Sequence, residues 1–353
     1  MSEQEASAAV KGSEGVKRKR EEMIAVGKAG VQRYLVTVEY MGTRFLGFQR
    51  QRDKRTVQGC LEAALEKFVG EPVISAVSSR TDAGVHALAN TCHVDIERRS
   101  KRKPGEVMPP HEPGVVHRAI NHFLHAQKNA GDMAVVGVRC VPPGFHCRYK
   151  AQERTYHYRL LTGNRQMSIF QKDQAWHVSE ELNLETMMEA CKVLVGHHNF
   201  SSFRATGCQA LSPIKTLDEL HVCEMPVWPC FPSPEDRKLS SESPETKDID
   251  KSTSESIDPI LRSKQGTQDN LRCIVVTARA RSFLYHQVRL LVGTLKAVGS
   301  GALAVHDVKR ILDAQDITQV PAMAPACGLY LAHVKYDFSD DNELGPNTDD
   351  ESE

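Results

Sequence analysis

Apolar and polar residues alternate along the segment RYLVTVEYMG, which places Val36, Val38 and Tyr40 on one face of an extended chain. Alternation with a period of two predicts a β-strand with one buried face. The segment TVQGCLEAALEKFVG then changes to helical spacing, with Thr56 suited to cap the start and Gly70 suited to end it. The first unit that the pattern predicts is therefore a strand followed by a helix.

The rest of the chain continues in the same way and divides into two halves with one order of elements. The first half goes on with the strands PVISAVS and NTCHVDIE, the helix GVVHRAINHFLHAQ and the strand MAVVGVRCV. The second half has the strand RTYHYRLL, the helix LETMMEACKVLVG, the strands TLDELHVCEM and LRCIVVTARA, the helices YHQVRLLVGTLKAVGSG and VHDVKRILDAQ, and the strand GLYLAHVKYDF. The order β-α-β-β-α-β therefore occurs twice.

This order is that of a split, ferredoxin-like unit, in which helices cover one face of an antiparallel sheet. We therefore predict the α+β class, with two ferredoxin-like halves whose sheets join and leave a central cleft. The N-terminal half, expected to be the catalytic one, spans residues 31–150, and the C-terminal half spans residues 151–338.

Three further segments lack the apolar residues that a packed core requires. Residues 1–30 form a polar, charged N-terminal tail, residues 339–353 form an acidic tail, and residues 231–270 are rich in Ser, Glu, Asp, Lys and Pro. Such compositions predict disorder. Because the third segment separates two predicted strands, we interpret it as a flexible insertion in a strand–strand connection.

Charge and cysteine content narrow the class of protein. The 353 residues include 45 Lys+Arg and 45 Asp+Glu, but much of the acidic charge lies in the predicted disordered segments, so the two halves are basic and suit an RNA partner. Ten cysteines without a CxxC pair predict reduced thiols in an intracellular protein. No apolar run approaches the roughly 18 residues of a membrane helix, so no membrane partner is expected.

The N-terminal residues indicate in which cellular compartment the protein is expected. Early acidic residues disfavour an organellar transit peptide. The run KRKR at residues 17–20 suits a nuclear localisation signal or an RNA-contacting arm, and equally a solvated basic patch. The expected location is the cytosol or the nucleus.

The segment SSRTDAGVHALAN, which joins two predicted strands, carries the densest group of reactive side chains. Asp82 lies in it between Arg80 and Gly84. Asp and Gly are common in turns for backbone reasons alone, so a structural Arg–Asp pair beside a turn is one interpretation. The other is a carboxylate nucleophile, kept ionised because a nearby arginine lowers its pKa.

Basic and aromatic residues alternate in two other stretches. YMGTRFLGFQRQ contains Arg44, Arg50 and Arg52, and FHCRYKAQERTYHYRL contains Arg148 and Lys150. Such mixtures suit RNA through base stacking and phosphate contacts. Solvated charges at the ends of strands would give the same pattern.

Two further positions complete the candidate site. Tyr156 and Tyr158 share one face of a predicted strand, where one ring could stack on a base or both could pack in the core. Arg289 interrupts an otherwise apolar helix, and a buried arginine requires a partner, for which Asp82 is the candidate. The alternative is an arginine that extends its head group to solvent at the helix edge.

Metal and nucleotide cofactors are not expected. Histidines cluster at His111, His117, His122 and His125, but the chain has no HExxH motif and no paired Cys/His spacing. It also lacks GxxxxGK[ST] and GxGxxG. We predict neither a metal site nor a cofactor.

The segment SSRTDAGVHALAN strongly resembles the active-site loop of the TruA family of tRNA pseudouridine synthases. Other segments resemble that family in the same order, from about residue 33 to 338: EYMGTRFLGFQRQ, TVQGCLEAAL, FHCRYKAQERTYHYRL, GHHNFSSFRA, SFLYHQVRLLVGTL and PACGLYLAHVKY. The resemblance implies the pseudouridine synthase fold and conversion of uridine to pseudouridine in RNA without a cofactor. In that reaction the base is detached from C1′, rotated and rejoined through C5.

The resemblance also assigns roles to residues. It makes Asp82 the nucleophile, directed at C1′ of the ribose or C6 of the uracil, and Tyr156 the ring that packs against the target base. Arg80 and Arg289 match the arginines beside the aspartate, and Arg289 is expected to pair with Asp82 across the two halves. Bacterial members act as homodimers on tRNA positions 38 to 40, whereas eukaryotic relatives modify other positions and other RNAs. The insertion and tails leave the target position and the oligomeric state open.

Two alternatives to this isomerase follow from the same residues. A non-catalytic RNA-binding protein or tRNA-folding chaperone on the same fold would have no need for Asp82. A structural protein that interacts through its acidic tails would leave the basic and aromatic loops unexplained. We therefore predict a tRNA pseudouridine synthase.

Overall fold

The structure is a computed structural model, and it describes residues 30–100, 102–103, 105–126, 131–164, 166–226 and 271–339. The predicted N-terminal tail with its KRKR run, the predicted insertion at 231–270 and the predicted acidic tail lie outside the described residues, apart from the boundary residues 30 and 339. Those predictions of disorder therefore stay predictions.

The first half has the predicted order of elements: β1 (Val31–Tyr40), α2 (Val57–Val69), β2 (Ser75–Val77), β3 (His86–Glu97), α3 (Pro113–His125) and β4 (Met133–Val141). The predicted ends of α2 are confirmed, because the Thr56 side chain accepts a hydrogen bond from the Gly59 N–H and Gly70 has a φ of +91°. A hydroxyl cap and a left-handed glycine satisfy the free backbone groups at the two ends of a helix.

The second half is more elaborate than predicted. It contains β5 (Glu153–Thr162), β6 (Trp176–Val178), α4 (Leu184–Leu194), β7 (Gly196–Asn199), β8 (Ile214–Leu217), β9 (Glu219–Met225), β10 (Arg272–Ala280), α6 (Gln287–Gly299), α7 (Val305–Ala314) and β11 (Leu329–Lys335). The predicted strand TLDELHVCEM is divided at Asp218, whose N–H donates to the Arg279 carbonyl, 2.9 Å away. Its first part, β8, pairs with β7 in a separate small sheet.

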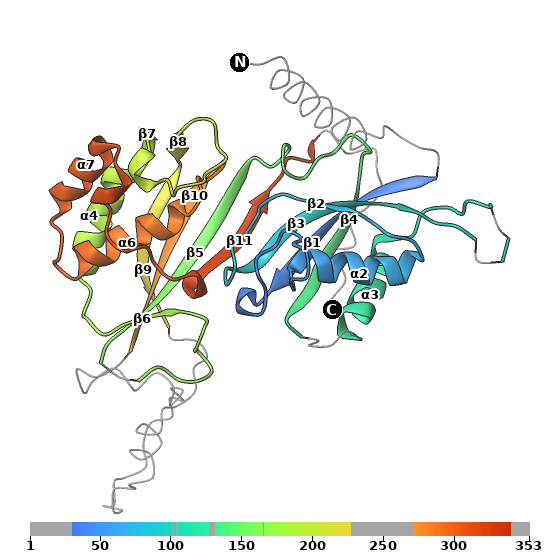
Figure 1. The fold of residues 1–353 in the computed structure, drawn as a ribbon, viewed down its shortest axis with the longest axis horizontal. Coiled ribbons are helices and arrows are strands. Elements are labelled where there is room, and N and C mark those ends of the chain that lie inside the picture. Colours follow the sequence, from blue (N-terminus) through green and yellow to red (C-terminus); the bar gives the residue numbers. More distant parts are fainter. Residues whose placement is uncertain are drawn as a thin grey trace, which may run out of the picture.

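A single large sheet runs through both halves in the order β4-β1-β3-β11-β5-β10-β9, with β2 paired to β3 and β6 paired to β5. Most neighbours are antiparallel, whereas β11 is parallel to β3 and β6 is parallel to β5. Figure 1 shows β11 and β5 in the middle of the molecule, with α2 and α3 beside the first half and α4, α6 and α7 beside the second. The last strand that the structure describes, β11, therefore joins the two halves.

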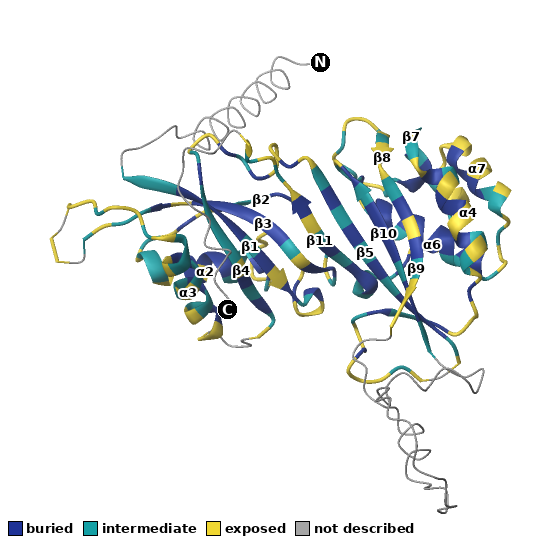
Figure 2. Ribbon diagram, turned by 180° about the vertical axis from the view of Figure 1, so that it is seen from behind, coloured by how far each residue is buried: buried dark blue, intermediate teal, exposed yellow. Residues whose placement is uncertain are grey.

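The predicted apolar faces form the core. Val36, Val38, Leu61 and Leu65 have no exposed surface, and they belong to a buried cluster that continues into the second half through Tyr158. Figure 2 shows this buried region along the central strands, with exposed residues on the outer sides of the helices. None of the described helices combines the length and the apolar character needed to cross a membrane.

Helix α6 is buried on nearly all sides, which agrees with its mostly apolar sequence. A Cβ added at Gly293 would lie 2.3 Å from the carbonyl oxygen of Ala322, so the helix and the segment before β11 are in direct backbone contact. This packing places the first turn of α6 at the junction of the two halves.

Candidate active site

The loop that carries Asp82 connects β2 to β3, as predicted. Gly84 has a φ of +81°, a conformation that glycine adopts without steric cost, and the Val85 N–H donates to the Asp82 carbonyl at 3.1 Å. The chain thereby turns sharply just after Asp82 and enters β3 at His86.

A buried polar network holds this loop to the sheet. The side-chain amide of Asn90 donates to the Ser79 carbonyl at 2.9 Å and to the Tyr40 hydroxyl at 3.0 Å. The Tyr40 hydroxyl is in turn 2.8 Å from the hydroxyl of Thr81. Buried polar groups are costly to leave unpaired. These bonds therefore fix Ser79 and Thr81, which lie on either side of Arg80, and Thr81 directly precedes Asp82.

The ionic neighbour of Asp82 is a residue that the sequence reasoning missed. Nε2 of His286 lies 3.2 Å from Oδ2 of Asp82, and the two side chains are 17% and 29% exposed. His286 immediately precedes α6, in the connection from β10. The pair therefore joins the Asp82 loop of the first half to the second half.

Electrostatics at this pair favour the neutral forms of both groups. Burial raises the pKa of the Asp82 carboxyl, and the positive charges of His286 and Arg289 oppose that rise. Burial also lowers the pKa of His286, an effect that Arg289 increases and Asp82 opposes. The interpretation in which Arg80 lowers the pKa of Asp82 is not supported, because burial is the largest effect and the positive charges that act on Asp82 are those of His286 and Arg289.

The two predicted arginines lie around Asp82 without forming an ion pair with it. Arg289 is in the first turn of α6, and its Nε donates to the Ala324 carbonyl at 2.8 Å. Its charge acts on Asp82 through space, so the predicted direct pair is corrected to an electrostatic neighbour. The exposed side chain of Arg80 donates to Oε1 of Gln209 at 3.0 Å, in the other half.

Tyr156 faces the site and Tyr158 does not. Tyr156, on β5, is 8% exposed, its hydroxyl is 2.9 Å from that of Ser79, and its ring meets the edge of Phe283 with 5.2 Å between ring centroids. Tyr158 is fully buried and donates to the Pro325 carbonyl at 2.8 Å. Of the two rings left open by the sequence, only Tyr156 reaches the Asp82 loop.

These side chains surround one cavity of about 400 Å³, which is lined by Asp82, Tyr156, His286 and Arg289. Its volume is in the range of about 300–1,000 Å³ that is usual for small-molecule sites. Basic and aromatic residues also line it: Arg80, Arg148, Tyr149, Arg281 and Tyr285. Two of these, Tyr149 and Tyr285, are exposed aromatic rings. The combination can receive a flat, uncharged base together with anionic phosphates.

Arg154, at the start of β5, supports the wall of this cavity. It is 8% exposed, and its guanidinium donates to the carbonyls of Arg281 at 2.5 Å, Ser78 at 3.0 Å and Arg148 at 3.2 Å. Each acceptor belongs to a different segment of the cavity lining. This structural role was not apparent from the sequence, because strand alternation does not show which backbone carbonyls a side chain reaches.

Other basic residues from the same motifs lie elsewhere. Arg50 and Arg52 line a separate surface hollow, where Arg50 pairs with Glu62 at 3.1 Å. His117 contacts the Val135 carbonyl, with 2.9 Å from its Nε2, as a helix residue facing β4. The predicted histidine cluster thus has ordinary packing roles at this position.

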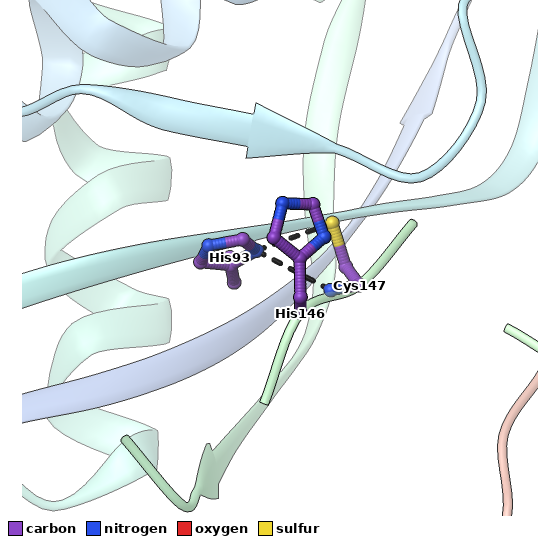
Figure 3. Close-up of side chains that lie close together, drawn as sticks. All are labelled: His93, His146 and Cys147. Atoms are coloured by element: carbon purple, nitrogen blue, oxygen red, sulfur yellow. Dashed lines mark hydrogen bonds between the residues drawn. The ribbon is translucent and has the colours of Figure 1, made fainter. Parts of the chain in front are cut away.

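A different group of side chains has the composition of a metal site. His93, His146 and Cys147 place one potential ligand atom each within 4.8 Å of one another (Figure 3). Nδ1 of His93 is 3.3 Å from the Cys147 sulfur, which also donates to the Ala76 carbonyl at 3.0 Å. His146 accepts a bond from the Arg148 N–H at 3.2 Å, and its Nε2 has no partner.

These contacts account for the cluster as a packing network beneath the loop that carries Arg148. Burial lowers the pKa of both imidazoles, and the charge of Arg33, which is itself paired with Asp95, adds to that effect. Soft ligands of this kind could hold Zn²⁺, but nothing in the geometry connects them to Asp82.

Comparison with known proteins agrees with this site. The sequence profile described as tRNA pseudouridine synthase matches residues 36–150 and 190–337. The chain is 36% identical over 304 residues to a protein of Xanthobacter autotrophicus named tRNA pseudouridine synthase A. The aligned region covers 86% of this chain and 99% of the relative. Proteins of the same name from Roseobacter denitrificans and Rhodospirillum centenum are 35% and 36% identical, over 87% of this chain and 96% and 100% of their own lengths. With the Asp82 cavity in place, we conclude that the chain belongs to the tRNA pseudouridine synthase family.

Proposed function

We propose that the protein isomerises uridine to pseudouridine in tRNA, with Asp82 as the nucleophile. The observation that carries this proposal is the position of the Asp82 carboxylate, which lines a cavity together with the buried ring of Tyr156 and several arginines. The similarity to enzymes named tRNA pseudouridine synthase A supports tRNA as the substrate. The product is an isomer of the substrate, so the reaction consumes no other reactant, and we propose that it uses no cofactor.

The residues around the cavity suit the steps of this reaction. The target nucleotide must leave its stack, at a cost of a few kcal/mol, and phosphate contacts with arginines such as Arg148 and Arg281 offset that cost. The ring of Tyr156 packs against the uracil. Arg289 opposes the effect of burial on Asp82, which keeps more of the carboxyl in the ionised form that attacks.

We also propose that each half is a ferredoxin-like unit. In the large sheet the strands of the first half lie in the order β4-β1-β3-β2, and those of the second half in the order β11-β5-β10-β9. If the main strands of each half are numbered along the chain, both halves have the same spatial order, 4-1-3-2. As the starting hypothesis for target and assembly, we propose a homodimer that acts on anticodon-arm positions 38 to 40, as the resemblance of the sequence to the TruA family implies.

The test is tritium release from tRNA transcripts labelled at C5 of uridine. Asp82→Asn should abolish release and leave tRNA affinity within about three-fold, because it removes the nucleophile without changing the shape of the side chain. Asp53→Asn is the matched control, since Asp53 is an exposed aspartate in another loop. Mapping of the modified uridine then fixes the target position.

Release by Asp82→Asn at the wild-type rate would contradict the nucleophile assignment. If the wild-type protein binds tRNA tightly but releases no tritium, the result would instead favour a non-catalytic RNA-binding protein or chaperone.

A further inference from the structure

His286 has a backbone conformation that is uncommon for its residue type. Its φ of 60° and ψ of 7° lie in the left-handed region, which few non-glycine residues occupy and which persists where the surroundings impose it. The surroundings here do so. The Leu284 N–H donates to Oε1 of the buried Gln287 at 2.8 Å, and the Tyr285 carbonyl accepts a bond from Ala205 at 3.1 Å.

The imidazole itself is also fixed on two sides. One face stacks on the ring of Tyr285, with 3.8 Å between centroids, and Nε2 lies 3.2 Å from the Asp82 carboxylate. A strained backbone, a stacked ring and a directed nitrogen together hold His286 at the reacting end of the cavity. Packing alone does not account for this arrangement, because a side chain that only filled the space would need no nitrogen directed at Asp82.

The isomerisation requires a group that accepts a proton. The bond between C1′ and N1 of uracil breaks, and a bond between C1′ and C5 forms. C5 then carries both the ribose and its original hydrogen, and it must lose that hydrogen as a proton before the ring is aromatic again. N1 gains one proton, so the overall reaction is balanced and needs no external reagent.

The cavity offers two candidates for this task. Apart from Asp82 and His286, the ionisable side chains that the described part of the chain places around the cavity are arginines and tyrosines. Arginines are protonated at any physiological pH and tyrosines ordinarily lose their proton only near pH 10, so neither type accepts a proton at neutral pH. A neutral imidazole accepts one readily, and burial keeps the pKa of His286 on the neutral side of its usual value.

We propose that His286 accepts the proton from C5 of the rejoined uracil and, as an imidazolium, is paired with the carboxylate of Asp82 until that proton is returned to N1 or to water. The proposal rests on the proposed function, because it assumes that uridine reacts in the Asp82 cavity. It assigns a second catalytic residue to the isomerisation, beside the proposed nucleophile.

The decisive measurement uses His286→Asn and tRNA transcripts that carry either hydrogen or deuterium at C5 of the target uridine. Asparagine tolerates a positive φ but cannot act as the base, so the fold is retained. The single-turnover rate should fall by about 100-fold or more, the usual contribution of a general base. The deuterium isotope effect should be larger in the variant than in the wild type, because loss of the C5 proton becomes the slow step.

A second variant, His286→Gly, also adopts a positive φ and leaves space for free imidazole, which should restore part of its rate. The control is His306→Gln, an exposed histidine on α7, which should behave as the wild type. Rates of His286→Asn within about three-fold of the wild type would overturn the proposal, and so would a slow variant with an unchanged isotope effect and no rescue by imidazole.

The two proposals fail in different ways. If Asp82→Asn is inactive and His286→Asn is fully active, the assignment of Asp82 as the nucleophile stands and the assignment of His286 as the proton acceptor is overturned. An inactive wild-type protein would contradict the proposed function and, with it, the role of His286.

Discussion

Replacing Arg154 by methionine tests whether one buried cation holds the wall of the cavity together. The side chain is 8% exposed and donates to three carbonyls, those of Ser78, Arg148 and Arg281. Methionine retains most of the volume but none of the donors. The three acceptors lose a charged partner, and the segments that carry them line the cavity beside Asp82.

The expected magnitude follows from two opposing terms. A hydrogen bond to a charged group contributes about 1.5–3 kcal/mol, so three such bonds contribute about 4.5–9 kcal/mol. Burial of a cation costs several kcal/mol, and burial accordingly lowers the pKa of Arg154. The difference predicts a loss of about 2–4 kcal/mol in the free energy of unfolding, or about 4–8 °C in Tm at roughly 2 °C per kcal/mol for a large domain.

The assay is thermal and urea unfolding combined with kcat/KM on tRNA. We expect Arg154→Met to lower Tm and kcat/KM together, since the loop before Asp82 and both flanking arginine segments lose one anchor. Arg154→Lys is the control for charge, because it keeps the cation but cannot reach three carbonyls with a planar fork. A methionine variant with wild-type Tm and wild-type kcat/KM would refute the reasoning, and so would complete rescue by lysine.

Three further predictions concern stability. Gly42→Ala should cost about 2 kcal/mol or more, measured by urea unfolding against Gly144→Ala, because a Cβ at Gly42 would lie 1.9 Å from the Val85 carbonyl oxygen whereas Gly144 has open space. His86 is fully buried, and burial lowers its pKa, so the unfolded chain takes up a proton on this side chain at a higher pH than the folded protein does. The Tm should therefore fall as the pH drops below about 6.5, and His86→Gln should weaken this pH dependence. Asp82→Asn should unfold at the same or a higher temperature than the wild type at pH 7, since the raised pKa shows that the ionised carboxyl is unfavourable there; a clearly lower Tm would contradict this.

Elements with a clear period were predicted well, and those set by tertiary contacts were not. The helix between Thr56 and Gly70 was bounded correctly because both end signals are local. The division of TLDELHVCEM at Asp218 was missed, because a backbone bond to Arg279, more than fifty residues later, ends the one strand and begins the next. Strand β7 was missed for another reason: it has only four residues and follows directly on α4, whose helical pattern continues to Gly196 in the sequence.

The candidate site shows the same division between local and distant causes. The loop motif placed Asp82 and Tyr156 correctly in one cavity, whereas the partner of Asp82 was assigned to Arg289 instead of His286. A helical pattern that starts too early caused that error, since the sequence YHQVRLL reads as helix from its first residue and the chain enters α6 only at Gln287. The histidine just ahead of the first helical turn was the available signal.

The position of β11 has a consequence for the order of events during synthesis of the chain. This strand is the last element that the structure describes, yet it pairs with β3 on one side and with β5 on the other. Its contact with β3 consists of two residue pairs, one of which is Tyr330 opposite His86. Domains fold as they emerge from the ribosome, at about 5–20 residues per second. The first half can fold early, but Asp82 meets His286 only after the second half has emerged, and the strand that joins the halves is made last. The cavity between the halves therefore has all of its lining only after the second half has been made.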